Sequence, residues 1–288
     1  MSKVWLITGA SRGLGRAFTE AVLEAGDRVV AAARKPEHLV ELESRYGENI
    51  RSVPLDVTNE EQANAAFGAA IANFGRLDVL VNNAGYGYVC PVEDTPIADF
   101  RAQIETNLFG VIIMTKAVLP YFRERRGGHI IQVTSIAGRV GPAGRAPYAA
   151  AKFGVEGFSE SLSREIGPLG VKVTIVEPGG FRTDFAGSST ELSEGRPEYD
   201  ATVGASVRFQ RNYNGRQPSD PAKAAAVLLH VVSLSEPPLR LLLGSDCYAA
   251  AEKSALEQLE SDRRWKDLSL STDYSADERH MSKNPVNS

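Results

Sequence analysis

The sequence predicts an α/β fold built on a doubly wound, mainly parallel sheet. Two observations support this prediction. Short β-branched runs alternate with longer segments of helical period, which is typical of right-handed βαβ units. The chain of 288 residues is also long enough to bury a sizeable core, in one large domain or two small ones. We expect strands at residues 4–8, 28–33, 52–55, 79–81, 130–134, 171–176 and 239–243.

Signals for helix starts lie between these strands. Thr58 and Glu61 have the spacing of a capping box, in which two side chains satisfy free backbone N–H groups of the first turn. Thr95 and Asp220 each precede a proline at a first helical position, and Pro147 opens a further helix. These signals predict helices in the connections between the strands.

Three segments define the organisation of the rest of the chain. After Thr95, apolar residues keep the spacing of one helix face, so a long helix should lie along the sheet. These residues are Phe100, Ile104, Leu108, Val111, Thr115 and Val118. Residues 181–217 form a long connection with scattered aromatic residues, which is typical of a lid. Residues 265–288 are polar, so we expect a catalytic domain over 1–264 followed by a loosely attached tail.

Composition and charge exclude several classes of protein. The chain has 32 basic and 36 acidic residues, a formal net charge of −4, and lacks the positive field that nucleic-acid binding requires. Cys90 and Cys247 fit neither a disulfide framework nor a zinc site, and we expect no metal. No export signal is visible, and the apolar stretches are shorter than the roughly 20 residues of a membrane span. The sequence therefore predicts a cytoplasmic protein without nucleic-acid or membrane partners.

A glycine-rich turn, TGASRGLG at residues 8–15, follows the first expected strand and precedes a helical segment at 16–25. Glycines there let the backbone approach a pyrophosphate, whose charge is favoured at a helix N-terminus. The alternative is that they only permit close packing, since the spacing differs from G-x-G-x-x-G. We interpret the turn as a dinucleotide site. Its expected contacts are Gly9, Ser11, Arg12, Gly13, Leu14 and Gly15.

The end of the second expected strand indicates which dinucleotide binds. Many such folds carry a carboxylate there for the adenosine ribose. This chain has Arg34 and Lys35 instead. A guanidinium can bind a 2′-phosphate through two hydrogen bonds, and Arg12 is a second candidate. The sequence therefore predicts NADP(H) rather than NAD(H), the alternative being that these are solvated loop charges.

Tyr148 and Lys152 lie four residues apart at the start of a helix, so they share one helix face. An ammonium about 4 Å from the phenol, at an effective dielectric of about 20, would stabilise tyrosinate by roughly 4 kcal/mol, or about three pKa units, before desolvation. Such a shift would make Tyr148 a general acid/base. Ser135 ends one strand, Asn82 to Gly85 end another, and Asn107 lies in the long helix, so these groups should converge at the carboxyl edge of the sheet.

These motifs together resemble the short-chain dehydrogenase/reductase family over roughly residues 3 to 247. The resemblance implies a single Rossmann-type domain with a seven-stranded parallel sheet. It also implies oxidation or reduction of an alcohol/carbonyl pair with a nicotinamide coenzyme. The motifs are TGASRGLG at 8–15, Asp56-Val57, NNAG at 82–85, Asn107, Ser135, Tyr148 with Lys152, and Pro178-Gly179 followed by Thr183.

The resemblance also implies roles for individual residues. Tyr148 would exchange the proton with the substrate oxygen, and Ser135 would hold that oxygen. Lys152 would bind the nicotinamide ribose and lower the tyrosine pKa, and Asn107 would hold a water. Each of the four has a structural alternative, such as an asparagine tied to the backbone. The coenzyme contacts implied are Asp56 and Val57 at the adenine, Asn83, Ala84 and Gly85 along the coenzyme, and Pro178, Gly179 and Thr183 at the nicotinamide end.

Substrate choice is expected to come from the loops around the nicotinamide end. Because these loops are mostly apolar and aromatic, the sequence predicts reduction of a fairly apolar ketone or aldehyde. They comprise Tyr86, Tyr88, Val89, residues 140–145 and the 181–217 segment. Arg139, Arg145 and Arg182 are either solvated loop charges or ligands for a carboxylate or phosphate.

The resemblance further implies a homodimer or homotetramer, assembled through the long helix and the helix that carries Tyr148. Two other classes of function remain open. A catalytically idle NADP(H)-binding regulator or scaffold would share the glycine-rich turn, but would have no use for the four residues above. A Rossmann-fold transferase using S-adenosylmethionine would have no role for the NNAG motif. We interpret His129, His230 and Cys90 as structural.

Overall fold

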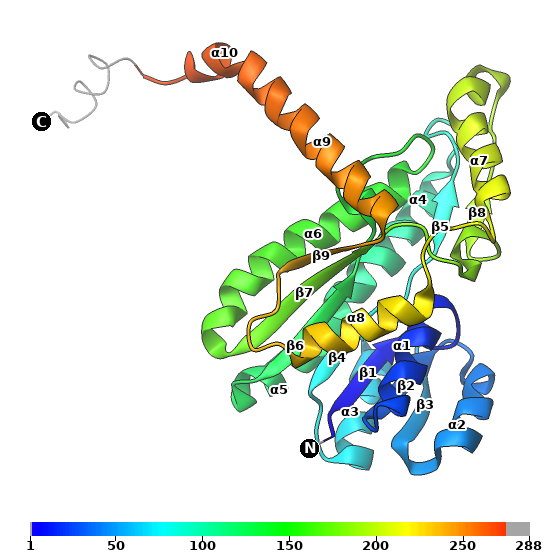
Figure 1. Ribbon diagram of the computed structural model, residues 1–288, viewed down its shortest axis with the longest axis vertical. Coiled ribbons are helices and arrows are strands. Elements are labelled where there is room, and N and C mark those ends of the chain that lie inside the picture. The colour runs from blue at the N-terminus through cyan, green and yellow to red at the C-terminus, as the bar shows by residue number, and fades with distance from the viewer. Residues whose placement is uncertain (1, 275–288) are drawn as a thin grey trace, which may run out of the picture.

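Seven parallel strands form the central sheet, in the order β3-β2-β1-β4-β6-β7-β9 (Figure 1). The computed structural model describes residues 2–274. The order reverses between β1 and β4, which makes the carboxyl ends of these strands the switch point where such folds bind ligands. All seven predicted strands are confirmed. They are β1 (Val4–Thr8), β2 (Arg28–Ala33), β3 (Ile50–Pro54), β4 (Val79–Asn82), β6 (Gly128–Val133), β7 (Val171–Pro178) and β9 (Arg240–Leu243).

Helices cover both faces of the sheet, as a doubly wound fold requires. Alternate residues of β1 point to opposite faces: Trp5 packs in the core under α1 (Gly13–Glu24), α2 (Val40–Tyr46) and α8 (Pro221–Ser233). Leu6 packs in the core under α3 (Glu60–Phe74), α5 (Gly110–Arg125) and α6 (Ala146–Ile166). The fold is therefore a single Rossmann-type α/β domain, as predicted.

The predicted long helix is present, with one interruption. It runs as α4 (Ile97–Ile104), a π-helical turn (Glu105–Phe109) and α5. The wider turn rotates the two halves relative to each other, so the buried side chains before α5 are Gln103 and Asn107 rather than the expected apolar ones. By length and a mean hydropathy of 1.2, the span from Ile97 to Arg125 could cross a membrane. Here the apolar side chains of α5 pack in the sheet core.

The helix starts were predicted with mixed success. Asp220 caps α8 as expected, because its carboxylate accepts from the Ala222 backbone N–H. The Thr58 capping box is wrong by one residue. Asn59 is the N-cap of α3 and accepts from Gln62 N at 2.9 Å. The Thr58 hydroxyl instead donates to Asp56.

A second, two-stranded sheet joins β5 (Gly87–Val89) to β8 (Thr190–Leu192) in parallel. It fixes part of segment 181–217 to the loop after β4. Val89 is buried against Val203 and Val207, and Tyr88 is buried with its hydroxyl donating to Asp99. Tyr88 and Val89, which were expected to face the substrate, therefore anchor this segment instead. The segment also contains α7 (Ala205–Tyr213), which lies beside β5 and β8 (Figure 1).

The C-terminal part of the described chain is helical. Helix α9 (Ser245–Arg264) extends away from the sheet, and α10 (Lys266–Leu270) lies at its far end (Figure 1). Only Cys247 and Ala251 of α9 are buried. Residues 265–274 are exposed, and the rest of the predicted tail lies outside the described residues. Both cysteines, Cys90 and Cys247, are free and buried.

Acid should destabilise the fold through His129 on β6. Its Nε2 lies 3.0 Å from the Thr174 hydroxyl, which itself donates to the Pro238 carbonyl, so Nε2 is the donor. Burial, with a smaller effect of the Lys172 charge, lowers the pKa of His129 to about 4. The ordinary value is about 6.5, so the folded protein binds fewer protons than the unfolded chain between pH 4 and 6.5. Stability therefore rises with pH through this window and is lost as pH falls.

We expect His129→Gln to flatten this dependence by about 3 kcal/mol in the free energy of unfolding between pH 6.5 and 4. Urea denaturation at a series of pH values measures it. His230→Gln, at an exposed histidine, is the matched control. If the parent and His129→Gln show the same slope over this window, His129 does not cause the acid sensitivity.

Candidate active site

A pocket of about 1590 Å³ opens at the carboxyl edge of the sheet. It exceeds the roughly 300–1,000 Å³ of common small-ligand pockets, so it has room for an extended ligand together with a second one. Every residue predicted for the site lines it except Gly15. These lining residues are Gly9, Ser11, Arg12, Gly13, Leu14, Arg34, Asp56, Val57, Asn83, Ala84, Gly85, Asn107, Ser135, Tyr148, Lys152, Pro178, Gly179 and Thr183.

The glycine-rich turn between β1 and α1 needs glycine for two different reasons. Gly9 and Gly13 have φ of 66° and 57°, a left-handed conformation that side chains disfavour. Gly15 is buried under the turn, where a Cβ would overlap the Gly9 carbonyl oxygen and the Asn83 amide. Gly15 therefore allows the turn to pack closely against α1, and its position beneath the turn explains why it does not line the pocket.

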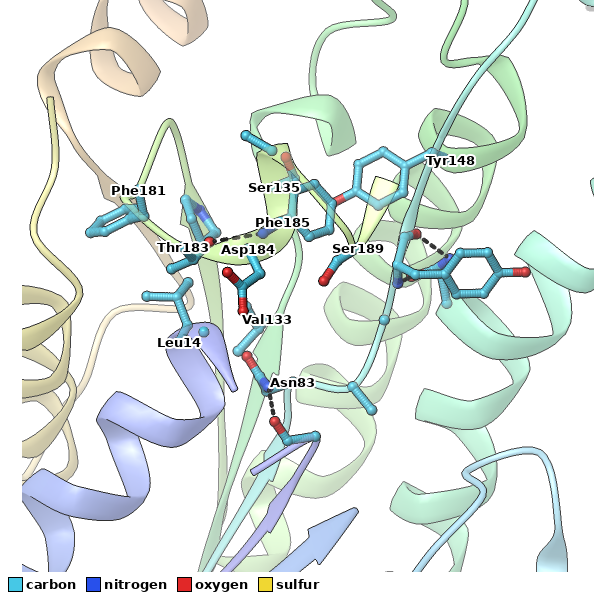
Figure 2. A pocket seen from close by; sticks show the side chains of 18 of the residues that line it. Leu14, Asn83, Val133, Ser135, Tyr148, Phe181, Thr183, Asp184, Phe185 and Ser189 are labelled. Carbon is cyan, nitrogen blue, oxygen red and sulfur yellow. Dashed lines mark hydrogen bonds between the residues drawn. The ribbon is translucent and has the colours of Figure 1, made fainter. Parts of the chain in front are cut away.

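Asn83 ties the end of β4 to this turn. Its Nδ2 donates to the Thr8 carbonyl at 3.0 Å, and the Thr8 hydroxyl accepts from the backbone N–H groups of Asn83 and Ala84, both at 3.0 Å. Figure 2 shows Asn83 on the side of the pocket that also carries Leu14. This bracing fixes the distance between the turn and the strand end across the switch point.

One end of the pocket is basic. Arg12, Arg34 and Lys35 are exposed, and Arg34 and Lys35 directly follow β2. Within residues 2–274 none of the three forms an ion pair. Asp56, after β3, uses one carboxylate oxygen to accept from the Thr58 backbone N–H and hydroxyl. This end therefore presents cations that no carboxylate of the described chain neutralises.

Tyr148 and Lys152 lie in the first two turns of α6, and both are buried. Burial raises the pKa of Tyr148, while the hydroxyl of Ser135 and the charge of Arg145 act in the opposite direction. Burial lowers the pKa of Lys152 to about 8, opposed by Glu156. Figure 2 shows Tyr148 pointing toward Ser135 and Phe185.

Lys152 is held by the backbone rather than by the tyrosine. Its Nζ donates to the Val133 carbonyl at 2.9 Å and lies 5.7 Å from the centre of the Tyr148 ring. The pKa of Tyr148 is raised overall, contrary to the expected lowering by Lys152, and the charge that opposes the effect of burial belongs to Arg145. From the sequence, Arg145 is either a solvated loop charge or an anion ligand, and its effect on the tyrosine was not expected.

Asn107 lies in the π-helical turn and is fully buried. Its Oδ1 accepts from Tyr86 N at 3.3 Å, and its Nδ2 donates to the carbonyls of Tyr86 and Gln103 at 3.2 and 3.1 Å. A Cβ on Gly85 would overlap Oδ1. The side chain therefore clamps the loop after β4, which is the structural alternative considered for it. Its Oδ1 accepts one hydrogen bond and keeps a second lone pair.

The segment after β7 crosses the pocket. Pro178 ends β7, and Gly179 N donates to the Leu243 carbonyl at 2.9 Å. The Thr183 side chain packs on Gly13, and the Phe185 ring lies 5.7 Å from the Tyr148 ring. Figure 2 shows Thr183 close to Leu14, and Phe185 next to Tyr148. The segment thus contacts both the glycine-rich turn and the tyrosine.

Helix α7, which belongs to the expected segment 181–217, closes the other end of the pocket. Phe209 and Tyr213 are stacked, with ring centres 5.0 Å apart. Gln210 accepts a hydrogen bond from Arg145. The buried amide of Gln217 also lines the pocket and has no hydrogen-bond partner within residues 2–274. The aromatic residues of this segment were expected near the substrate, whereas no sequence signal marks Gln210 and Gln217, because β5 and β8 bring α7 to the site.

Two of the three arginines considered as anion ligands are engaged elsewhere. Arg139 pairs with the buried Glu177 at 2.6 Å, and the Arg182 Nε donates to the Gln217 carbonyl at 2.8 Å. Of the three, only Arg145 lines the pocket. The described residues hold no cluster of three or more side chains suited to a metal ion.

A glycine-rich turn at the switch point of a parallel sheet, opening on a long pocket, defines a Rossmann-type dinucleotide-binding protein. The family model for short chain dehydrogenases matches residues 3–193. The chain belongs to this family and is an oxidoreductase of the short-chain dehydrogenase type.

Comparison with known proteins agrees with this assignment. Oxidoreductase BOA17 of Botryotinia fuckeliana is 47% identical over 273 residues, which cover 94% of this chain and 100% of that protein. A solved short-chain dehydrogenase from Streptomyces avermitilis is 38% identical, with a TM-score of 0.90 and coverage of 95% of this chain and 100% of that one. The closed form of serine dehydrogenase complexed with NADP⁺ is 30% identical, with a TM-score of 0.72 and coverage of 83% and 94%.

Proposed function

We propose that the protein transfers a hydride between NADP(H) and a carbonyl/secondary alcohol pair, acting as a reductase of a ketone or aldehyde with a largely apolar body. The observation that carries this proposal is the convergence of Tyr148, Ser135 and Lys152 in the same pocket as the glycine-rich turn. Aromatic side chains of segment 181–217 line the pocket next to Tyr148, which supports an apolar substrate body.

The residues present fit a dinucleotide. Gly9, which has no side chain, lets the turn lie directly against Ala84 and Asn83, and α1 begins at Gly13 with its free N–H groups near the pocket. When bound, the coenzyme supplies or accepts the hydride. We assign its contacts to Gly9, Ser11, Arg12, Gly13, Leu14, Arg34, Asp56, Val57, Asn83, Ala84, Gly85, Tyr148, Lys152, Pro178, Gly179 and Thr183.

The catalytic roles follow from position and chemistry. In the direction of reduction, the Tyr148 hydroxyl donates its proton to the substrate oxygen, and the Ser135 hydroxyl donates a hydrogen bond to the same oxygen. Lys152, held by the Val133 carbonyl, directs its remaining N–H donors toward the ribose and the tyrosine. Asn107 positions the loop through Tyr86, and we assign the expected water to the remaining lone pair of its Oδ1.

The coenzyme preference is tested by Arg34→Ala. We expect weaker NADPH binding by about 10- to 100-fold and little change for NADH, because a charged hydrogen bond to a phosphate contributes about 1.5–3 kcal/mol. Isothermal calorimetry with both coenzymes measures this. Arg123→Ala, at an exposed arginine outside the pocket, is the control. Equal or tighter NADH binding by the parent would contradict the NADP(H) assignment and leave the dehydrogenase intact.

We also propose that the protein forms a homodimer or homotetramer through α4, α5 and α6. Ile97, Phe109 and Phe153 on these helices are 66%, 45% and 44% exposed, although they are large and apolar. Light scattering should give a mass of two or four times 31.1 kDa. A mass of one chain at working concentration would contradict this. A cytoplasmic location and the absence of nucleic-acid and membrane partners stay predictions.

A further inference from the structure

Arg145 is a cation at the substrate end of the pocket without an acidic partner. It is the N-cap residue of α6, three positions before Tyr148, and its side chain is partly buried and lines the pocket. Its guanidinium donates to the Gln210 side-chain carbonyl. No ion pair within residues 2–274 involves it. A guanidinium has five N–H donors, so one neutral acceptor leaves most of them for a ligand.

The backbone at this position is held in place. Gly144 has φ of 81°, and a Cβ there would press on Val203 and Val89. The Gly144 carbonyl accepts from the Cys90 backbone N–H at 2.9 Å. Arg145 is therefore placed by the same contacts that hold segment 181–217, and it does not need to be ordered by a ligand.

Gln210 completes the arrangement from α7. It is 6% exposed and fixed to Arg145 through its side-chain carbonyl. Its amide Nε2 donates no hydrogen bond within the described chain and remains available next to the guanidinium. Phe209 and Tyr213 flank it on the same helix and line the pocket. The same part of the pocket also holds the amide of Gln217 and the Asp246 carboxylate, which accepts from the Tyr213 hydroxyl. Arg145 is the cationic group among them.

The distance to the reaction centre limits what this pair can bind. Residues three apart on a helix have Cβ atoms about 5–6 Å apart, so the side chains of Arg145 and Tyr148 can contact neighbouring parts of one substrate. The basic residues Arg12, Arg34 and Lys35 lie in the loops after β1 and β2, away from α7, and are assigned to the coenzyme. Arg139 and Arg182 are paired with Glu177 and a backbone carbonyl. Arg145 is therefore the cation left for the substrate.

We propose that Arg145 and Gln210 form a carboxylate subsite, so that the substrate is an oxo acid with an apolar body and its carboxylate within a few bonds of the reacting carbonyl. A planar guanidinium matches a carboxylate through two hydrogen bonds, and partial burial strengthens the pairing. This inference rests on the proposed reductase function and names its substrate class.

The test compares oxo acids with their neutral esters. The probes are 2-oxo-4-phenylbutanoate and 3-oxooctanoate, each with its methyl ester, reduced with NADPH by the parent, Arg145→Gln and Arg145→Lys. We expect the parent to prefer at least one acid over its ester by 10-fold or more in kcat/KM. Arg145→Gln should remove that preference by raising KM for the acid only. The loss of the Arg145 charge also acts on the Tyr148 pKa, but it should change kcat for acid and ester by the same factor. Arg145→Lys should restore part of the preference.

The matched control is Arg211→Gln, which removes one positive charge from the neighbouring position of α7. Arg211 pairs with Glu194 and does not line the pocket, so the ratio of acid to ester should stay that of the parent. A parent that reduces the esters as well as the acids overturns the subsite and leaves the reductase standing. An equal loss for acid and ester in Arg145→Gln also overturns it, because the arginine would then support the fold alone.

A binding measurement separates the two proposals. Octanoate has no carbonyl group that the enzyme could reduce, so its binding can be measured alone. Calorimetric titrations compare its affinity with that of the neutral octan-1-ol, for the parent and for Arg145→Gln. We expect Arg145→Gln to weaken octanoate binding by at least 10-fold and to leave octan-1-ol unchanged. If the parent and Arg145→Gln bind octanoate with equal affinity, the proposed carboxylate subsite is wrong. Failure of every carbonyl compound to be reduced, with Arg145-dependent octanoate binding intact, overturns the reductase function instead.

Discussion

Tyr148→Phe is expected to lower kcat for carbonyl reduction by about 10²- to 10⁴-fold, the usual contribution of a positioned general acid. The substitution removes only the hydroxyl. The ring keeps its contact with Phe185 at 5.7 Å, so the pocket should keep its shape. Steady-state reduction of a carbonyl panel with NADPH measures the loss.

Coenzyme affinity and thermal stability supply the controls for Tyr148→Phe. Thermal stability should stay close to the parent value, and NADPH affinity should fall by no more than the loss of one hydrogen bond allows, far less than kcat. The loss of rate then comes from the missing proton donor. If Tyr148→Phe turned over substrate as the parent does, the tyrosine would have no catalytic role. If neither the parent nor Tyr148→Phe reduced any carbonyl compound while both bound NADPH, that result would favour the idle NADP(H)-binding regulator.

Gly15→Ala is expected to weaken NADPH binding by at least about 10-fold and to lower the melting temperature. The added Cβ would overlap the Gly9 carbonyl and the Asn83 amide, and neither can move without changing the turn. Small-to-large changes in packed positions typically cost about 1–3 kcal/mol. Calorimetric titration with NADPH and thermal unfolding measure the two effects.

Gly68→Ala is the matched control, because it makes the same change inside a helix. Gly68 lies in α3 with no heavy atom within 4 Å of an added Cβ. Alanine there should stabilise the protein by about 0.5–1 kcal/mol, since glycine weakens helix interiors. If Gly15→Ala bound NADPH as tightly as Gly68→Ala does, the close packing under the turn would not be required.

Most of the sheet could be predicted because buried parallel strands are continuous β-branched runs. The strands β5 and β8 could not be predicted. Each is only three residues long, and β5 begins with Gly87, so neither shows a recognisable alternation of polar and apolar residues. The cap of α3 shows another limit. Thr58 and Asn59 are both good N-cap residues, and each has a suitable acidic or amide residue three positions later. The choice between them depends on where the backbone leaves β3.

The site shows the same division. The glycine-rich turn and the residues at the strand ends follow from local motifs, and of the coenzyme contacts and catalytic residues predicted from them all except Gly15 line the pocket. The clamp of Asn107 on Tyr86 could not be foreseen, because it depends on the π-helical turn. The pairing of Arg145 with Gln210 joins positions 65 residues apart. Such contacts are created by tertiary packing and leave no periodic signal.

The projecting helix α9 gives the molecule two levels of local stability. Beyond Ala251 none of its residues is buried within the described chain. Isolated helices of about 12–15 residues are marginal in water, so the outer turns open without disturbing the sheet. Amide hydrogens there exchange through local fraying, whereas those of β6, at the centre of the core, exchange only when the whole domain opens. The boundary between the two regimes lies within a single continuous helix.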